Sequence, residues 1–212
     1  MAIAFAEFTN GGVATTYSHT TSGSNRYLFV GITGGLTNNV TAVTYSGVSM
    51  TQVGTTQQRP SSRYVYLYGL VAPASGANNV VITISGGDIG QSFAWGYTGA
   101  KQTSPISGVV NSSGTQANIA QSVTTTDDNS IAFIYAGTGA PQTVGAGTTK
   151  RTNADYDNAY DSGNTVITPP GAYTLNITFT NEGFGLIAGA IAPEVAATPS
   201  KNFPTLTLLG VG

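Results

Sequence analysis

The chain has 212 residues, of which 7 are basic and 9 acidic, so charged residues make up 8% where soluble domains usually carry about 25%. There is no cysteine, which excludes disulfides, thiolate catalysis and cysteine-based metal centres. The net charge of −2 gives no basic footprint for nucleic acid, and a hydrophobic content of 40% is too high for a disordered chain.

Short runs of alternating apolar and polar residues recur along the chain, separated by clusters of Gly, Asn and Ser. The expected strands, in chain order, are Ile3–Thr9, Arg26–Ile32, Val40–Tyr45, Val48–Val53, Arg63–Val71, Asn79–Ser85, Ser92–Tyr97, Ile119–Thr124, Ser130–Ala136, Thr165–Thr168, Tyr173–Thr180 and Gly183–Ile191. Only Asp155–Asp161 is expected to hold a helical turn. This pattern predicts an all-β fold, a two-sheet antiparallel β-sandwich of jelly-roll or Ig-like type with an extended C-terminal arm.

Segments in the two halves of the chain resemble each other. Tyr27–Gly35 resembles Ile131–Gly139, at an offset of 104, and Phe93–Ala100 parallels Gly185–Ala192. These echoes would suit a duplicated half-sandwich, although alternation in a chain rich in Gly and Thr also creates them. One sandwich and two small domains both fit this length, and the lack of a charged or proline-rich linker over Gln102–Gln116 favours one domain.

The expected organisation is an N-terminal strand and polar loop over residues 1–25, a β-sandwich over residues 26–193 and an extended arm over residues 194–212. The segment Met1–Phe8 has no basic n-region and is interrupted by Glu7, so it is not expected to act as a signal peptide. The longest apolar run, Phe184–Ala192, is far shorter than the roughly 20 residues that span a bilayer. No membrane partner is expected.

Three prolines, at positions 193, 199 and 204, lead into the apolar segment Thr205–Gly212. Proline holds a chain extended, and an apolar, strand-prone segment is a liability when it is exposed to water. We therefore expect this segment to add a strand to the sheet edge of a neighbouring subunit; folding back over its own sandwich is the alternative. The residues expected to make these assembly contacts are Phe203, Leu206, Leu208, Leu209 and Val211.

The single histidine, His19, is the base that any Ser-His-Asp arrangement would need. It lies in the polar stretch Thr15–Gly23, and the chain contains no G-x-S-x-G nucleophile elbow. His19 is therefore expected to lie at the surface, and no catalytic residue is expected.

Paired carboxylates could serve a glycosidase, but no expected strand carries two acids at positions i and i+2. The acids are expected to be solvated turn residues: Glu7, Asp88, Asp127, Asp128, Asp155, Asp157, Asp161, Glu182 and Glu194. Asp155, Asp157 and Asp161 could together supply oxygen ligands to calcium. Because the segment lacks the glycine and the terminal glutamate of an EF-hand loop, a surface loop without metal is expected.

Aromatic residues offer another possible site. Trp95 and the 11 tyrosines could form a platform on which sugars stack, which is one use of a β-sandwich. Half-buried ring packing is the more common role of tyrosines in strands, since a tyrosine ring can pack while its hydroxyl stays wet, and it is the role expected here.

Six segments share a strand-and-turn pattern: Val40–Val53, Tyr66–Gly76, Val80–Gly86, Tyr97–Pro105, Ser122–Ala132 and Ala190–Pro193. In this order they resemble a β-sandwich module found in tailed-phage virion proteins and in large bacterial surface proteins. The resemblance covers about Arg26 to Pro193, and it leaves the first 25 residues and the tail outside. It implies a fold and brings no catalytic residue to this chain.

These features predict a non-enzymatic structural protein of a phage-like virion, most simply a capsid decoration or a tail or fibre subunit. Its expected partners are other copies of itself and neighbouring virion proteins, it would be assembled in the host cytoplasm, and no cofactor is expected. The alternative is a carbohydrate-binding or adhesive β-sandwich module, extracellular in location, whose partner is a cell-surface glycan.

Overall fold

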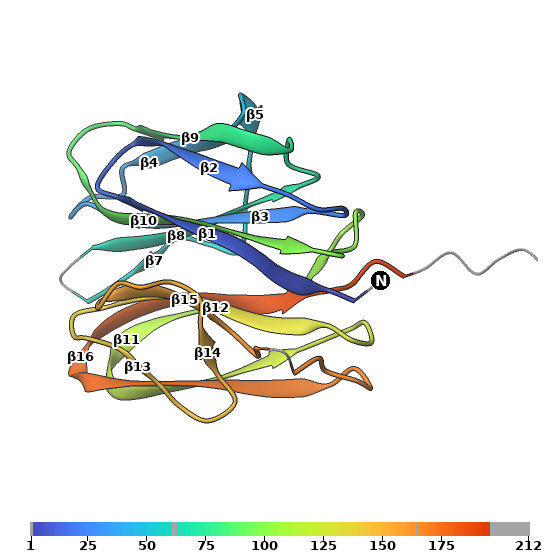
Figure 1. Cartoon of the computed structure of the whole chain (residues 1–212). Coiled ribbons are helices and arrows are strands. Elements are labelled where there is room, and N and C mark those ends of the chain that lie inside the picture. Colours follow the sequence, from blue (N-terminus) through green and yellow to red (C-terminus); the bar gives the residue numbers. More distant parts are fainter. Residues whose placement is uncertain (1, 61–62, 164, 196–212) are drawn as a thin grey trace, which may run out of the picture.

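The computed structural model describes residues 2–60, 63–163 and 165–195. Regular structure in these ranges consists of strands only, which pair antiparallel in three sheets (Figure 1). The expected all-β, antiparallel sandwich-like architecture is thus confirmed, with three sheets in place of two. The five expected assembly residues of the arm lie outside the described residues.

The first sheet has the order β1-β10-β3-β8-β6, with β7 also paired to β8. Its strands are β1 (Ala4–Gly12), β3 (Tyr27–Gly34), β6 (Thr51–Gln52), β7 (Gln57–Gln58), β8 (Tyr64–Val71) and β10 (Ile89–Thr98). A second sheet of order β2-β9-β4-β5 covers one face of it (Figure 1). That sheet comprises β2 (Thr16–Thr21), β4 (Val40–Tyr45), β5 (Val48–Ser49) and β9 (Gly76–Ile84).

The third sheet has the order β11-β16-β12-β15-β14, with β13 also paired to β16. Its strands are β11 (Ile106–Thr124), β12 (Ile131–Thr138), β13 (Thr143–Val144), β14 (Thr149–Lys150), β15 (Asp157–Asp161) and β16 (Ala172–Ile191). The start of β16 pairs with β13 and its end with β12, so the long antiparallel pair of β11 and β16 runs through two layers (Figure 1). The third sheet thereby forms a sandwich by folding over itself.

The two halves of the molecule have equivalent topology. The strand order β1-β10-β3-β8-β6 of the first half repeats as β11-β16-β12-β15-β14 in the second. The outer strands also share an irregularity, because β1 carries a bulge between Phe5 and Phe8 and β11 one between Ser107 and Val110. Gly108 permits the second bulge: its φ is +58°, and a Cβ there would lie 2.1 Å from the Thr124 carbonyl oxygen. The echoes in the sequence therefore correspond to a structural repeat.

The central strands of both halves are buried on both faces. In β3, Leu28 and Val30 face the second sheet, whereas Phe29 faces the third sheet. The ring centroid of Phe29 lies 4.7 Å from that of Phe133 in the other half, and 5.2 Å from that of Trp95 on the neighbouring strand β10. One aromatic cluster thus joins the two halves.

Three expectations about local structure were wrong. Thr16–Thr21, expected to be part of a polar loop, forms strand β2 beside β9, and the segment expected to hold a helical turn contains strand β15. Of the expected strand Thr165–Thr168, only Ile167 pairs, in an isolated bridge with Ser130. Strands β2 and β15 are stabilised by contacts with residues distant in the sequence, and such contacts cannot be predicted from the local hydrophobic pattern.

Candidate functional site

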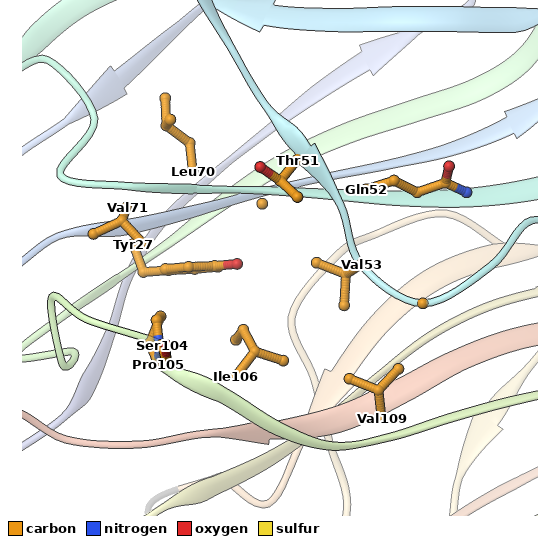
Figure 2. Close-up of a pocket in the computed structure, with 12 residues that line it drawn as sticks. Tyr27, Thr51, Gln52, Val53, Leu70, Val71, Ser104, Pro105, Ile106 and Val109 are labelled. Carbon is orange, nitrogen blue, oxygen red and sulfur yellow. The ribbon is translucent and has the colours of Figure 1, made fainter.

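An open groove of about 510 Å³ lies where the edge of the first sheet meets the edge of the third (Figure 2). It is lined by Tyr27, Thr51, Gln52, Val53, Gly54, Gly69, Leu70, Val71, Ser104, Pro105, Ile106 and Val109, none of which is charged. Tyr27 extends into the groove between Val53 on one wall and Ile106 on the other (Figure 2). The volume falls within the usual range for ligand sites, about 300–1,000 Å³.

The structural repeat places an equivalent edge on the opposite side of the molecule. On the groove side, Thr51 of β6 pairs with Gly69 of β8; on the opposite side, Thr149 of β14 pairs with Asp161 of β15. Gly69 and Asp161 therefore hold equivalent positions. At position 69 a Cβ would lie 2.0 Å from the Tyr27 hydroxyl oxygen, so the glycine gives Tyr27 the room to lie across the groove.

Val53 and Arg151 are equivalent in the same way. Each lies two residues after the paired threonine, and each donates its backbone N–H across a 2.8 Å hydrogen bond, Val53 to Leu67 O and Arg151 to Ala159 O. The groove side therefore has a short apolar side chain where the opposite side has a long cationic one.

Because of this difference, side chains fill the space between the sheets at the edge that carries Arg151, and the space at the groove edge stays open. The Arg151 guanidinium lies 4.5 Å from the centroid of the Phe5 ring, and its Nε donates to Asp161 Oδ2 over 2.7 Å. The Tyr97 hydroxyl donates to the same oxygen over 2.6 Å, and burial beside that carboxylate raises the pKa of Tyr97 well above its ordinary value. On the groove side valine and glycine replace Arg151 and Asp161, so the space between the sheets stays unfilled.

A smaller, polar cavity of about 190 Å³ lies between Arg59, Arg63, Tyr156 and Asp157. Arg63 donates to the Gly34 carbonyl over 3.1 Å, whereas the buried Nε of Arg59 has no hydrogen-bond partner. Burial lowers the pKa of Arg59 and raises that of Asp157. The cavity offers charged hydrogen-bonding groups and the exposed ring of Tyr156 to a small polar molecule.

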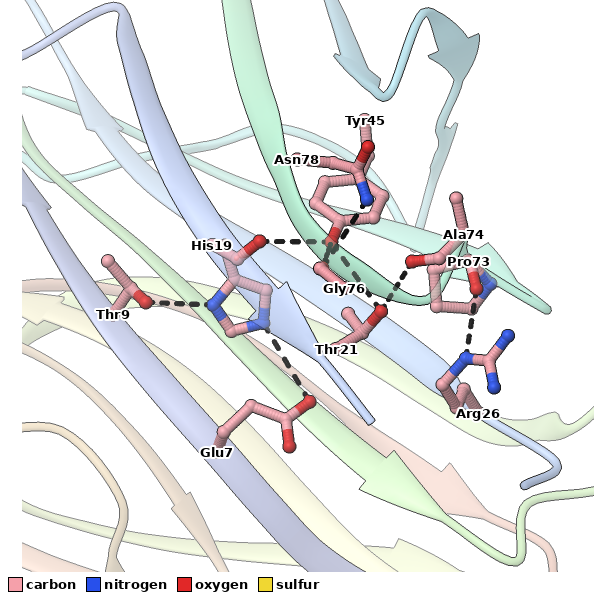
Figure 3. Close-up of polar contacts among 10 residues, drawn as sticks. All are labelled: Glu7, Thr9, His19, Thr21, Arg26, Tyr45, Pro73, Ala74, Gly76 and Asn78. Atoms are coloured by element: carbon pink, nitrogen blue, oxygen red, sulfur yellow. Dashed lines mark hydrogen bonds and ion pairs between the residues drawn. The ribbon is translucent and has the colours of Figure 1, made fainter. Parts of the chain in front are cut away.

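His19 is buried, with 1% of its surface exposed, so its expected surface position was wrong. Strand β2 places its ring 6.2 Å from that of Tyr45, and its Nδ1 lies 2.9 Å from Thr9 Oγ1 (Figure 3). Its Nε2 lies 4.0 Å from Glu7 Oε1, too far for a hydrogen bond. The hydroxyl, imidazole and carboxylate resemble a triad in composition, but none of the three borders the two cavities above. We interpret His19 as a structural residue.

Burial lowers the pKa of His19 to about 4 from an ordinary 6.5. The unfolded chain therefore binds the proton more tightly, and the stability contributed by neutral His19, present above pH 6.5, is lost as the pH falls toward 4. Burial raises the pKa of Glu7, so Glu7 makes the folded state more stable as the pH falls, opposite to the effect of His19. Comparing the wild type with a His19→Leu variant isolates the contribution of His19. We expect the difference in unfolding free energy, wild type minus variant, to fall by about 3 kcal/mol between pH 7 and pH 4. Urea titrations at each pH measure it; a constant difference would contradict the buried imidazole.

The segment Asp155–Asp161 was expected to be a surface loop without metal, and this was wrong for two of its three acids, because Asp155 is exposed but Asp157 and Asp161 are buried. Asp157 and Asp161 lie in β15, with 9% and 0% of their surfaces exposed. Asp157 accepts a 2.7 Å hydrogen bond from Thr33, while Asp161 binds the arginine and tyrosine described above, so the two carboxylates serve different partners. Within the described residues, no group of three or more His, Cys, Asp or Glu side chains could hold a metal ion.

Trp95 does not form a sugar-stacking platform. That side chain is 1% exposed and its ring stacks at 5.8 Å on the ring of Tyr135, so it belongs to the core between the halves. Most of the tyrosines are also buried: Tyr27, Tyr45, Tyr66, Tyr68, Tyr97, Tyr135 and Tyr160. The groove itself was not predicted, because its lining comes from four separate stretches of the chain.

No family model, curated protein or solved structure matched the chain in the comparisons with known proteins. Across the described ranges, no helix is long and apolar enough to cross a membrane. The groove, the sheet edges and the polar cavity are therefore the features of the molecule that bear on its function.

Proposed function

We propose that this protein is a non-enzymatic structural component of a phage-like virion, a capsid decoration or a tail or fibre subunit, which acts by packing against other copies of itself and neighbouring virion proteins. The proposal comes from the resemblance of its strand-and-turn segments to a virion module and from the character of its sheet edges. The sheet edges provide the physical support.

The observation that carries the proposal is the edge strand β11. It runs over 19 residues and contains neither a charged residue nor a proline, and no described strand pairs with its outer edge. Soluble monomers usually protect edge strands with charges, prolines, bulges or short length, and of these β11 has only its bulges. Of the other edge strands, β1 contains Glu7 and β14 contains Lys150. An edge of this length without charge or proline favours a protein that pairs with a neighbour.

The surface has little charge to oppose such packing. The net charge is −2, and two of the nine acids, Asp157 and Asp161, are buried. Exposed valines extend the apolar surface; Val109 lies in the groove wall, and Val48 and Val144 lie on other strands. Close contact with neutral, threonine-rich neighbours therefore meets little electrostatic repulsion.

A carbohydrate-binding or adhesive module is the second candidate, and the polar cavity favours it. Charged planar groups such as Arg59, Arg63 and Asp157 suit hydrogen bonding to sugar hydroxyls, and the exposed Tyr156 ring could stack on a sugar face. The cavity is smaller than the usual ligand site, which favours at most a single sugar unit. We rank the carbohydrate-binding module second because it assigns no role to the larger, apolar groove.

Locating the protein separates these candidates. Immunogold electron microscopy of cells that carry the gene, and of particles that they release, is expected to place the label on particles. Label on the outer cell surface would favour the adhesive module and contradict the virion role.

A further inference from the structure

The groove between the two sheet edges is suited to an extended apolar peptide. Its walls are apolar, with Val53 and Val71 on one side and Ile106 and Val109 on the other. It lies beside β6 and β11, which are the edge strands of their sheets. A peptide in the groove could therefore bury its side chains and also pair its backbone with a strand edge.

The sequence beyond the described residues contains a segment of matching chemistry. Thr205–Gly212 has no charge, and its alternation would place Leu206 and Leu208 on one face of an extended strand and Thr205 and Thr207 on the other. The preceding residues, 196–204, could span up to about 30 Å when extended. That length is enough to carry the segment away from its own subunit.

The direction in which the chain leaves the sandwich favours a second copy over its own groove. Ala192 donates to Pro105 O at the end of the groove and accepts from the N–H of Lys101, and Glu194 then donates to Gly99 O. The chain thus runs antiparallel to residues 99–105, away from the groove, as far as Val195, which is 69% exposed. Reaching its own groove would require the following residues to reverse direction.

We propose that the groove binds the segment Thr205–Gly212 of a second copy of this chain. The leucines fill the space that the Arg151 side chain fills at the equivalent closed edge, and the backbone pairs with a free strand edge. This inference rests on the proposed function and deepens it, because it names the contact that links subunits.

Disulfide trapping tests this contact, because the chain has no cysteine of its own. One full-length protein carries Val109→Cys in the groove wall and a second, distinguishable by mass, carries Leu208→Cys. The matched control is Val144→Cys, which is also an exposed valine but lies on β13, outside the groove. After mixing and mild oxidation, mass spectrometry without reductant is expected to show at least tenfold more mixed disulfide with Val109→Cys than with the control. Adding Leu206→Asp to the Leu208→Cys protein is expected to lower that yield tenfold.

Two results would overturn the inference. Equal yields with the groove and control cysteines would show that the segment does not recognise the groove. An intramolecular disulfide in a chain carrying both Val109→Cys and Leu208→Cys, without mixed disulfide between chains, would show that each subunit fills its own groove.

The failure of this inference can be distinguished from failure of the proposed function. A chain found in particles but showing no selective mixed disulfide would overturn the groove contact alone. A selective mixed disulfide in a chain that is absent from particles would support the groove contact and overturn the virion role.

Discussion

Replacing Trp95 by alanine is expected to lower the free energy of unfolding by about 3–5 kcal/mol, the range for removing a large aromatic side chain from a core. Trp95 is 1% exposed, stacks on Phe29 at 5.2 Å and on Tyr135 at 5.8 Å, and so contacts both halves of the molecule. Its loss therefore weakens the junction between the halves as well as the first sheet.

Urea titration followed by far-UV circular dichroism measures this effect, since the variant has no tryptophan left for fluorescence. Val144→Ala is the control: its side chain is exposed on β13, and its removal should change stability by less than about 0.5 kcal/mol. A loss below about 1 kcal/mol for Trp95→Ala would contradict a core shared by the two halves.

Replacing Asp161 by alanine is expected to cost about 3–5 kcal/mol, because it removes one partner of a buried ion pair. The carboxylate has no exposed surface and accepts from Tyr97, Arg151 and the backbone N–H of Gly163 over 2.6–2.7 Å. Without it, a buried hydroxyl and a guanidinium lose their acceptor. The closed edge of the molecule would be the first region to loosen.

A second ion pair provides the matched control for Asp161. Asp127 accepts from Lys101 over 2.9 Å, but both side chains are partly exposed, so Asp127→Ala should cost no more than about 1 kcal/mol. Thermal and urea unfolding of the two variants measure the contrast. Equal losses would show that the buried pair contributes no more than the surface pair.

The sequence predicted the strands whose stability comes from their own hydrophobic pattern. Val40–Tyr45 was predicted with the bounds of β4, and the bounds of β3, β8 and β12 were predicted to within two residues. Their alternating side chains each enter one of two cores, so period-2 alternation is sufficient to find them.

The sequence did not predict the strands whose burial depends on distant partners. His19 in β2 is covered by Tyr45, and Asp161 in β15 is paired with Arg151 and Tyr97. Polar residues favour a loop by local rules, and only the three-dimensional contacts override that preference. The groove could not be predicted for a related reason. It exists because Gly69 stands where the other half of the molecule has Asp161, and that equivalence is visible only in the strand pairing.

Immunogold labelling of purified particles, released by cells that carry the gene, would show whether this chain is a virion component. We expect gold on particle surfaces at a density at least tenfold above that on particles from cells in which the gene is deleted. Gold confined to the outer cell surface, or to the soluble fraction with particles unlabelled, would contradict it.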